Sequence, residues 1–398
     1  MNSNIAQLSK IAGKKSRLII GLMSGTSLDG LDVALCKISG QGLATRVDLL
    51  KFQTLAYKEE IKSQILEVFA KRQIDFQALC ELNASIASLH STMILQCLKK
   101  WKYTTARIDI IASHGQTVFH SPKSITPNAK INSTLQIGDG DHLAVKTGII
   151  TISDFRQKHV AKGGEGAPLA VYGDYMLYSK KGEDRIMLNM GGIGNFTYLP
   201  GSVNASHVFV TDTGPANTLL DQTVRHYRSD IHYDKDSLLA IKGTFNQKLL
   251  KVLMDDSFFK LPFPKTVGPE LFNMEYVLKA QKTSATEKIS LEDLLATLTR
   301  FSAESIATAI KKVIKGKKSF RLFLSGGGAH NPLMVQWIKE LLPSVQFNNM
   351  DDLGISGDAK EAVLFAVLAN EAMAGGKVHY GNRSKVPSIS MGKISFPK

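Results

Sequence analysis

The sequence has few cysteines and no long hydrophobic run, and both absences limit what the protein can be. Its 398 residues include three cysteines, Cys36, Cys80 and Cys97, and no Cys-x-x-Cys spacing. A disulfide framework and a zinc site built on paired cysteines are therefore excluded. The longest apolar runs, "LIIGLM" and "AVLFAVLA", are far shorter than the roughly 20 residues that span a bilayer. We expect no membrane association, no cleaved signal peptide and, by default, a cytoplasmic location.

The chain also lacks a concentrated basic segment, although its formal net charge is +14. Such a surplus favours an anionic partner, which could be a nucleic acid, an acidic membrane surface or a small molecule. The lysines are dispersed, and the densest cluster, "KKVIKGKK", has the pattern of a solvated helix end. No basic stripe is interleaved with the aromatic side chains on which bases stack. We therefore interpret the positive charge mainly as a solvated surface and expect no nucleic-acid partner.

The hydrophobic pattern predicts one order of elements twice. In the first half, three strands come before two helices and a fourth strand, which contains "RIDIIASHG". The second half repeats the three strands with "DRIMLNM", "IGNFTYL" and "SHVFVTDTG", and later supplies the strand "FRLFLSGGG" and two helices. We therefore predict an α/β fold of two duplicated domains, residues 1–182 and 183–398, each with strand-strand-strand-helix-strand-helix order.

Glycine-rich turns follow the first strand of each half, in "GLMSGTSLDG" and "MGGIGN". Glycines let backbone N–H groups approach an anion closely, so both turns are candidates to hold phosphate. Neither contains the lysine of a Walker P-loop. A third turn, "LSGGGAHN", leads from a strand into a helix that Asn331-Pro332 can start. That arrangement favours a flat or anionic ligand at a helix N-terminus.

Several charged residues have both a functional and a structural explanation. Asp212 ends an apolar strand before Gly214-Pro215, where a general base and a helix-capping aspartate are equally plausible from the residues alone. Arg156 suits a bidentate contact to a carboxylate, although a lone arginine is more often a surface ion pair. Glu361 opens a predicted helix, where the helix dipole favours a carboxylate in any case.

Together and in this order, the motifs resemble the anhydro-N-acetylmuramic acid kinase family, within the superfamily of actin, sugar kinases and heat-shock chaperone ATPases. The resemblance runs from Arg17 to about Ala374 through "GLMSGTSLDGLD", "SHGQT", "LQIGD", "DFR", "GGEGAPL", "LNMGGIGN", "DTGPANTLLD", "SGGGAHNP" and "GDAKEA". It implies two ribonuclease H-like domains around a central nucleotide cleft. It also implies ATP and Mg²⁺ as cofactors, an amino sugar as substrate, and a homodimer.

The resemblance further implies a reaction in which water opens the 1,6-anhydro bridge of the sugar while the γ-phosphate of ATP moves to the freed O6. Asp212 would be the base that deprotonates the water. The residues implied for nucleotide binding are Gly25, Thr26, Ser27, Asp29, Gly30, Gly191, Gly192, Gly326, Gly327, Gly328 and Asn331. Those implied for the sugar are His114, Gln116, Arg156 and Glu361. Asp29 is also a candidate to bind Mg²⁺ through water, although its Asp-Gly turn explains it without a metal.

Two positions depart from the family pattern: His159 stands where aspartate is common, and Glu165 where glutamine is common. The segment "AVYGD" replaces an expected proline and histidine. These changes line the expected sugar side, so a kinase of another anhydrosugar or amino sugar stays open. An ATP-driven interaction protein of the actin or chaperone type is disfavoured, because we find neither an appended peptide-binding domain nor a long exposed apolar segment. Residues 1–16 have no assigned role.

Overall fold

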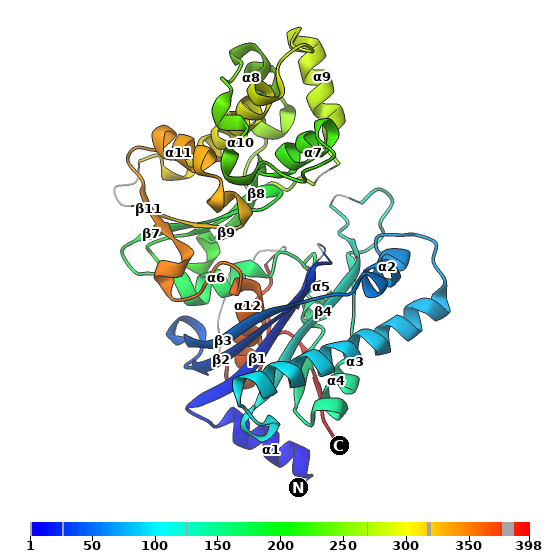
Figure 1. The fold of residues 1–398 in the computed structure, drawn as a ribbon. Coiled ribbons are helices and arrows are strands. Elements are labelled where there is room, and N and C mark those ends of the chain that lie inside the picture. Colours follow the sequence, from blue (N-terminus) through cyan, green and yellow to red (C-terminus); the bar gives the residue numbers. More distant parts are fainter. Residues whose placement is uncertain (1, 26–27, 125, 269, 317–319, 376–385) are drawn as a thin grey trace. The chain divides into compact units, whose positions relative to one another are not determined.

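The computed structural model describes residues 2–25, 28–124, 126–268, 270–316, 320–375 and 386–398. The chain forms two compact units (Figure 1). The first comprises Met1–Tyr178 and Gly354–Lys398, and the second comprises Ser179–Leu353. The second unit is therefore inserted, in sequence, between two segments of the first.

A seven-stranded mixed sheet forms the centre of the first unit. Its strands are β1 (Ser16–Ser24), β2 (Gly30–Ser39), β3 (Arg46–Ala56), β4 (Ile110–Ser121), β5 (Ser133–Ile137), β6 (Thr151–Ser153) and β12 (Lys393–Ser395). They are ordered β12-β6-β4-β1-β2-β3, and β5 pairs with β4. Strands β1, β2 and β3 form an antiparallel meander, whereas β4 runs parallel to β1, and β6 runs parallel to β4.

Helices cover both faces of this sheet. They are α1 (Ser3–Ala12), α2 (Glu59–Val68), α3 (Phe76–Trp101), α4 (Gly140–Thr147), α5 (Phe155–Ala161), α6 (Ala170–Tyr178) and α12 (Lys360–Ala374). Ile20 and Leu22 of β1 share a core with the buried face of α3. The intervening Gly21 meets α12 instead, since a Cβ there would lie 1.9 Å from the Ala362 carbonyl oxygen. Because side chains alternate along a strand, α3 and α12 pack on opposite faces of β1.

The C-terminal segment corrects one predicted boundary. The sequence-based division placed residues 354–398 in the second domain, but they belong to the first unit. The reason is tertiary: α12 lies against β1, and β12 pairs with β6 in antiparallel register. In Figure 1 the orange and red end of the chain accordingly lies among the blue and cyan elements of the first unit.

The second unit repeats the same strand pattern. Its strands are β7 (Asp184–Met190), β8 (Ile193–Leu199), β9 (Phe209–Pro215), β10 (Phe320–Ser325) and β11 (Gln346–Asn349). Their order is β11-β10-β7-β8-β9, with an antiparallel β7-β8-β9 meander and β10 and β11 added in parallel. Strands β3-β2-β1-β4-β6 of the first unit have that same arrangement. The predicted α/β fold with duplicated, ribonuclease H-like order is confirmed.

The helices of the second unit are α7 (Thr218–Tyr227), α8 (Gln247–Met254), α9 (Met274–Ser284), α10 (Leu291–Ile314) and α11 (Pro332–Leu341). Helix α10 is the most central, because its residues Leu294, Leu298, Phe301 and Ile306 are completely or almost completely buried in one core with β7 and β8. Ser290 caps its N-terminus by accepting the Asp293 N–H at 3.1 Å.

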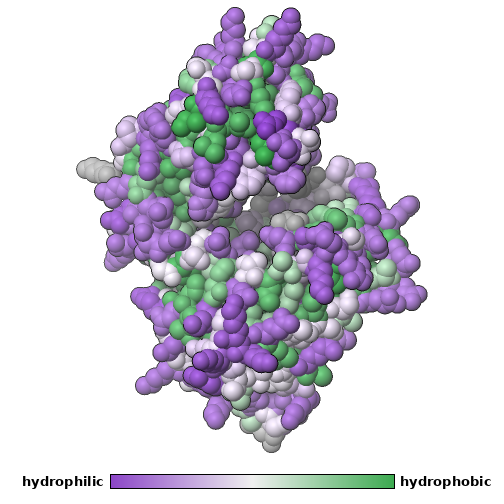
Figure 2. All heavy atoms as spheres, in the orientation of Figure 1, coloured by the Kyte–Doolittle hydropathy of each residue, from purple (hydrophilic) through white to green (hydrophobic). Residues whose placement is uncertain are grey.

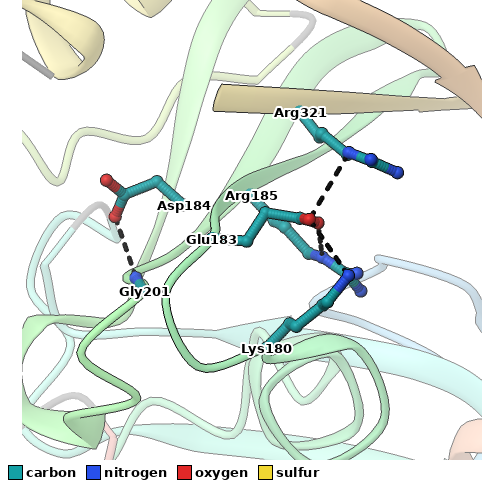
Figure 3. Close-up of polar contacts among 6 residues, drawn as sticks. All are labelled: Lys180, Glu183, Asp184, Arg185, Gly201 and Arg321. Atoms are coloured by element: carbon teal, nitrogen blue, oxygen red, sulfur yellow. Dashed lines mark hydrogen bonds and ion pairs between the residues drawn. The ribbon is translucent and has the colours of Figure 1, made fainter. Parts of the chain in front are cut away.

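An ionic cluster lies where β7 and β10 begin (Figure 3). The Glu183 carboxylate accepts hydrogen bonds from Arg185 Nε at 2.7 Å and Lys180 Nζ at 3.2 Å, and Arg321 Nε lies 3.4 Å away. Arg185 and Arg321 are direct neighbours across the parallel pair β7-β10. Like charges in that position repel, so Glu183 compensates a repulsion that the strand register creates.

The surface offers no sign of a membrane segment within the described residues. No helix there is both long and apolar enough to cross a bilayer. Figure 2 shows hydrophilic residues distributed over the visible face of each unit, with smaller hydrophobic areas between them.

Candidate functional site

The turn between β1 and β2 carries the first predicted phosphate-binding residues. Thr26 and Ser27 lie outside the described residues. Gly25 begins the turn, and its carbonyl oxygen accepts the Leu28 N–H at 3.4 Å. Leu28 has a φ of 58°, a left-handed conformation that reverses the chain direction in a short distance.

Asp29 and Gly30 close this turn. The Asp29 carbonyl oxygen accepts the Tyr57 N–H at 3.1 Å, which fixes the end of the turn to the end of β3. A Cβ at Gly30 would lie 2.1 Å from the Leu55 carbonyl oxygen. The close approach of β2 and β3 therefore explains this glycine without any ligand.

Gln116 of β4 contacts the same turn. Its side-chain nitrogen donates to the carbonyl oxygens of Gly25 and Thr117, both at 3.1 Å, and its side-chain oxygen accepts from Ser24 Oγ. Gln116 is fully buried, and these bonds use both of its amide hydrogens. The contacts favour a role in holding the turn over the predicted contact with a sugar.

His114 and Arg156, both predicted to bind the sugar, are brought together. Arg156 Nε donates to His114 Nε2 at 2.9 Å, and one terminal nitrogen donates to the Gly166 carbonyl oxygen at 2.6 Å. Burial lowers the pKa of His114 well below its usual value, and the Arg156 charge adds to that effect. Burial also lowers the pKa of Arg156 to about 10, which leaves the guanidinium charged at neutral pH. The pair thus presents a fixed cation beside a neutral imidazole.

Glu361, in the first turn of α12, belongs to an acidic group. Burial raises its pKa above the usual value, the Arg156 charge opposes this, and the charges of Asp32 and Asp29 add to it. Burial likewise raises the pKa of Asp32, and the charges of Asp29 and Asp358 contribute. The charges of Asp29 and Asp32 thus act on Glu361, and those of Asp29 and Asp358 act on Asp32.

These carboxylates are the residues to compare with the ligands that the implied Mg²⁺ would need. Within the described residues, no three His, Cys, Asp or Glu side chains form a ready metal shell. Mg²⁺ usually keeps several waters and is held by one or two carboxylates together with substrate phosphates. Asp29, in the turn predicted to bind phosphate, and Asp32, near the start of β2, are carboxylates of the kind that this mode needs.

His159, the first departure from the family pattern, is completely buried. Its Nδ1 accepts the Gly166 N–H at 3.0 Å, and its ring packs edge-on against Tyr172. Burial lowers the pKa of His159 to about 4, so it is neutral at pH 7. His159 therefore shapes the 163–166 turn, whose Gly166 carbonyl oxygen holds Arg156. Glu165, the second departure, is half-buried in the same turn.

In the second unit, Gly191 and Gly192 form the turn between β7 and β8. The Gly192 carbonyl oxygen accepts N–H groups from Ala216 at 2.8 Å and Thr218 at 3.0 Å, which ties the turn to the start of α7. A Cβ at Gly191 or Gly192 would meet no atom closer than 3.7 Å. Packing within the protein does not require these glycines, so they leave bare backbone with room for a ligand, as the prediction of a phosphate turn needs.

The three glycines after β10 differ in how closely other atoms pack around them. A Cβ at Gly326 would lie 2.4 Å from Asn189 Oδ1, and one at Gly328 would lie 2.7 Å from Met190 Cβ. Those two positions allow the turn to pack on the end of β7. A Cβ at Gly327 would meet no atom within 3.6 Å, and Gly327 lines a cavity.

That cavity has a volume of about 500 Å³, a size typical of small-molecule sites. Its lining residues are Asn217, Leu220, Asp221, Arg225, His232, Tyr233, Asp234, Lys235, Asp236, Gly327, His330 and Asn331. Asn331 caps α11 as expected, accepting the Met334 N–H at 2.8 Å. The sequence pointed to Gly327 and Asn331 only, because residues 232–236 have no periodic pattern that marks them as the wall of a cavity.

Asp212 lies within β9 and caps no helix. Helix α7 begins at Thr218, after Asn217, so the helix-capping alternative is wrong. Asp212 Oδ2 accepts the Val267 N–H at 2.7 Å, and the Asp212 N–H donates to the Lys265 carbonyl oxygen at 2.9 Å. The loop after residue 263 thus orients both the backbone and the carboxylate of Asp212.

The surroundings of Asp212 suit a base. Burial raises its pKa to about 6, and the Val267 N–H and the Lys265 charge oppose the rise. Lys265 Nζ donates to the Phe258 carbonyl oxygen at 2.8 Å. It also lies 4.0 Å from the centre of the Phe258 aromatic ring. Burial lowers the pKa of Lys265 to about 8. A carboxylate with a pKa near the working pH is both ionised and basic enough to take a proton.

Comparison with known proteins identifies the family of this chain. The sequence matches the family described as anhydro-N-acetylmuramic acid kinase over residues 17–384. The enzyme of that name from Pseudoalteromonas atlantica is 54% identical, and that from Pseudoalteromonas translucida is 50% identical, each over the full length of both chains. The one from Caldanaerobacter subterraneus is 41% identical over 98% of this chain and 100% of its own. This chain therefore belongs to the anhydro-N-acetylmuramic acid kinase family.

Proposed function

We propose that this chain is an ATP-dependent kinase that opens the 1,6-anhydro ring of anhydro-N-acetylmuramic acid with water and phosphorylates O6. The products are N-acetylmuramic acid 6-phosphate and ADP, which makes the reaction a step in cell-wall recycling. Membership of the family supports the substrate and the phosphoryl transfer. The observation that carries the chemistry is Asp212, a carboxylate fixed by the Val267 N–H with a pKa of about 6.

The proposed step is balanced in atoms and charge. Asp212 takes a proton from water, and the water oxygen forms a bond to C1 of the sugar. The C1–O6 bond breaks, and O6 bonds to the γ-phosphorus of ATP while the bond from phosphorus to the β-γ bridging oxygen breaks. ADP leaves, and one proton is released to solvent from Asp212. The protein contributes a base and fixed donors for the phosphate charge.

The remaining groups are assigned by their chemistry. Arg156 would bind the lactyl carboxylate of the sugar, with His114 accepting its Nε–H group and Glu361 nearby. The turns at Gly25 and at Gly191-Gly192 would bind phosphates through backbone N–H groups. The cavity lined by Gly327 and Asn331 would take the adenosine. Because His159 is buried behind the 163–166 turn, we propose that it shapes the sugar side without touching the sugar.

Mg²⁺, the oligomeric state and the location complete the proposal. Asp29 and Asp32 would hold Mg²⁺ through water, and the ion would neutralise phosphate charge. The resemblance to the family implies a homodimer in the cytoplasm. Light scattering on the purified chain measures the oligomeric state, and ADP release with and without a chelator measures the need for Mg²⁺.

The test is ADP release with 1,6-anhydro-N-acetylmuramic acid in ¹⁸O-water, followed by mass spectrometry of the product at early times. Early sampling matters because a free anomeric hydroxyl slowly exchanges its oxygen with water. We expect sugar-dependent ADP release, with ¹⁸O at C1 and none in the phosphate.

Two other outcomes decide between the alternatives. ADP release that requires another anhydrosugar or an amino sugar would keep the kinase and change the substrate. Sugar-independent ATP hydrolysis would contradict the proposal and favour an ATP-driven interaction protein.

A further inference from the structure

A buried chain of hydrogen bonds connects α3 with the β1-β2 turn. His90 Nε2 lies 2.6 Å from the Tyr57 hydroxyl oxygen, which lies 2.7 Å from Ser24 Oγ. Ser24 Oγ is also hydrogen-bonded to the side-chain oxygen of Gln116, whose nitrogen donates to the Gly25 carbonyl oxygen. The hydrogen-bonded series thus ends at Gly25, in the turn proposed to bind phosphate.

The donors and acceptors fix the direction of this chain. Gln116 uses both amide hydrogens on carbonyl oxygens, so its side-chain oxygen accepts the Ser24 hydroxyl hydrogen. Ser24 Oγ must then accept from the Tyr57 hydroxyl, and the Tyr57 oxygen must accept from His90 Nε2–H. The remaining His90 nitrogen, Nδ1, has no partner within the described residues. In this tautomer it is an acceptor, and an unpaired acceptor is tolerated better than an unpaired donor.

Burial keeps the chain in this one protonation state. His90 and Gln116 are fully buried, and Ser24 and Tyr57 are almost so. Burial lowers the pKa of His90 to about 4 and raises the pKa of Tyr57 above its usual value. Neither group changes charge near neutral pH, so the direction of the chain is constant. A buried network in which each shared hydroxyl and amide group is hydrogen-bonded rigidifies its surroundings.

The same residues fasten both ends of the turn. Gln116 binds the Gly25 carbonyl oxygen at the start, and the Tyr57 N–H binds the Asp29 carbonyl oxygen at the end. Ser24 Oγ lies 3.2 Å from the Gly30 carbonyl oxygen, beside the same end. We propose that Ser24, Tyr57 and Gln116 are positioning residues that hold the β1-β2 turn ready for phosphate, and that His90 anchors them to α3. The link to ATP rests on the proposed function.

The first test removes one hydroxyl. Tyr57→Phe leaves His90 Nε2–H and Ser24 Oγ without their shared partner and loosens the turn. We expect the Kd for ADP, measured by calorimetry, and the KM for ATP to rise about tenfold. The KM for the sugar should stay within about twofold. Tyr276→Phe is the matched control, because its hydroxyl donates to the Leu253 carbonyl oxygen at 2.6 Å in the second unit. It should cost comparable thermal stability without changing the Kd for ADP.

The second test replaces the side-chain amide of Gln116 with a carboxylate. Gln116→Glu keeps the acceptor for Ser24 but places a carboxylate oxygen against the carbonyl oxygens of Gly25 and Thr117. A larger rise in the Kd for ADP than in Tyr57→Phe is expected. Gln136→Glu, on the neighbouring strand β5, is the control, since Gln136 donates to Thr134 and Thr117 hydroxyls and does not contact the turn.

Hydrogen exchange of residues 24–30 separates this inference from the proposed function, because it needs no substrate. Exchange there should accelerate in Tyr57→Phe and Gln116→Glu but not in the controls, even if the sugar proves to be a different one. Folded Tyr57→Phe protein with wild-type exchange in this segment, or with equal rises in both KM values, overturns the proposal. So does an unchanged Kd for ADP.

Discussion

The pKa of Asp212 determines the pH range in which the proposed reaction can proceed. The carboxylate must be unprotonated to accept a proton from water, and its pKa is about 6. We therefore expect kcat to be constant above pH 7 and to fall as the pH drops through 6, in a profile measured from pH 5 to 8. Asp212→Asn should lower kcat by about 10²- to 10⁴-fold with little change in the Kd for ADP. Asp230→Asn, at an exposed ion pair in the same unit, should behave like the wild type.

Lys265 offers a way to shift that profile. Its buried charge lowers the pKa of Asp212, against the larger effect of burial. In Lys265→Met the pKa of Asp212 should rise, so the acid limb of the kcat profile should move to higher pH. Lys260→Met removes an exposed lysine that pairs with Asp255, and its profile should not move. An unshifted profile in folded Lys265→Met would show that the lysine acts on packing alone.

At the scale of single residues, the sequence was most informative where a short motif indicates a local structure or function. The motifs predicted a base at Asp212 and ligand-binding turns at Gly191, Gly192 and Gly327, and the structure leaves space at each of these glycines. The sequence did not point to Tyr57 or His90, because their hydrogen bond joins the residue after β3 to α3, which are far apart in sequence. The sequence predicted a sugar contact for Gln116, and no sequence pattern indicated its hydrogen bonds to Ser24 and Gly25.

At the scale of secondary structure, hydrophobic periodicity was sufficient for most of the sheet. Apolar runs predicted β1 and β7, alternating apolar residues predicted β2 and β8, and the helical spacing of Leu82, Ile86, Met93 and Cys97 predicted α3. Strand β12 is different. It has three residues, and its partner β6 lies some 240 positions earlier in the chain. No local pattern encodes such a pairing, which is why the last residues were assigned to the wrong domain.

The Glu183 cluster makes a stability prediction for the β7-β10 pair. Burial alone would raise the pKa of Glu183, but hydrogen bonds from Arg185 and Lys180 lower it below the usual value. A carboxyl with a lowered pKa stabilises the folded state above its unfolded pKa, and this contribution disappears as the pH falls through the folded pKa. Glu183→Gln removes the carboxylate charge to which the buried Arg185 donates at 2.7 Å.

We expect this substitution to lower the free energy of unfolding at pH 7 by about 2 kcal/mol. The difference from the wild type should shrink in more acidic buffers, when both proteins are followed by urea unfolding. Asp255→Asn breaks an exposed pair with Lys260 and should cost less than about 0.5 kcal/mol. Equal losses in the two variants would refute the assigned role of the cluster.

At the scale of the whole molecule, the two units differ in whether one continuous segment of sequence forms them. Residues 179–353 form one continuous segment with its own sheet and core. Expressed alone, this segment should fold, with a cooperative thermal transition followed by circular dichroism. A chain that ends at residue 353 should retain that transition but lose the one that belongs to the first unit, because α12 and β12 are missing. A fully cooperative first unit without residues 354–398 would contradict this view of its sheet.

The insertion also has a consequence for the order of events on the ribosome. Synthesis at about 5 to 20 residues per second delivers the whole second unit before α12 leaves the exit tunnel. During that interval β1 has one face without its helix, although every strand of its meander has already been made. The second unit can thus finish folding while the first still waits for its last 45 residues. A nascent chain stalled in this window is the form of the protein that most needs a chaperone.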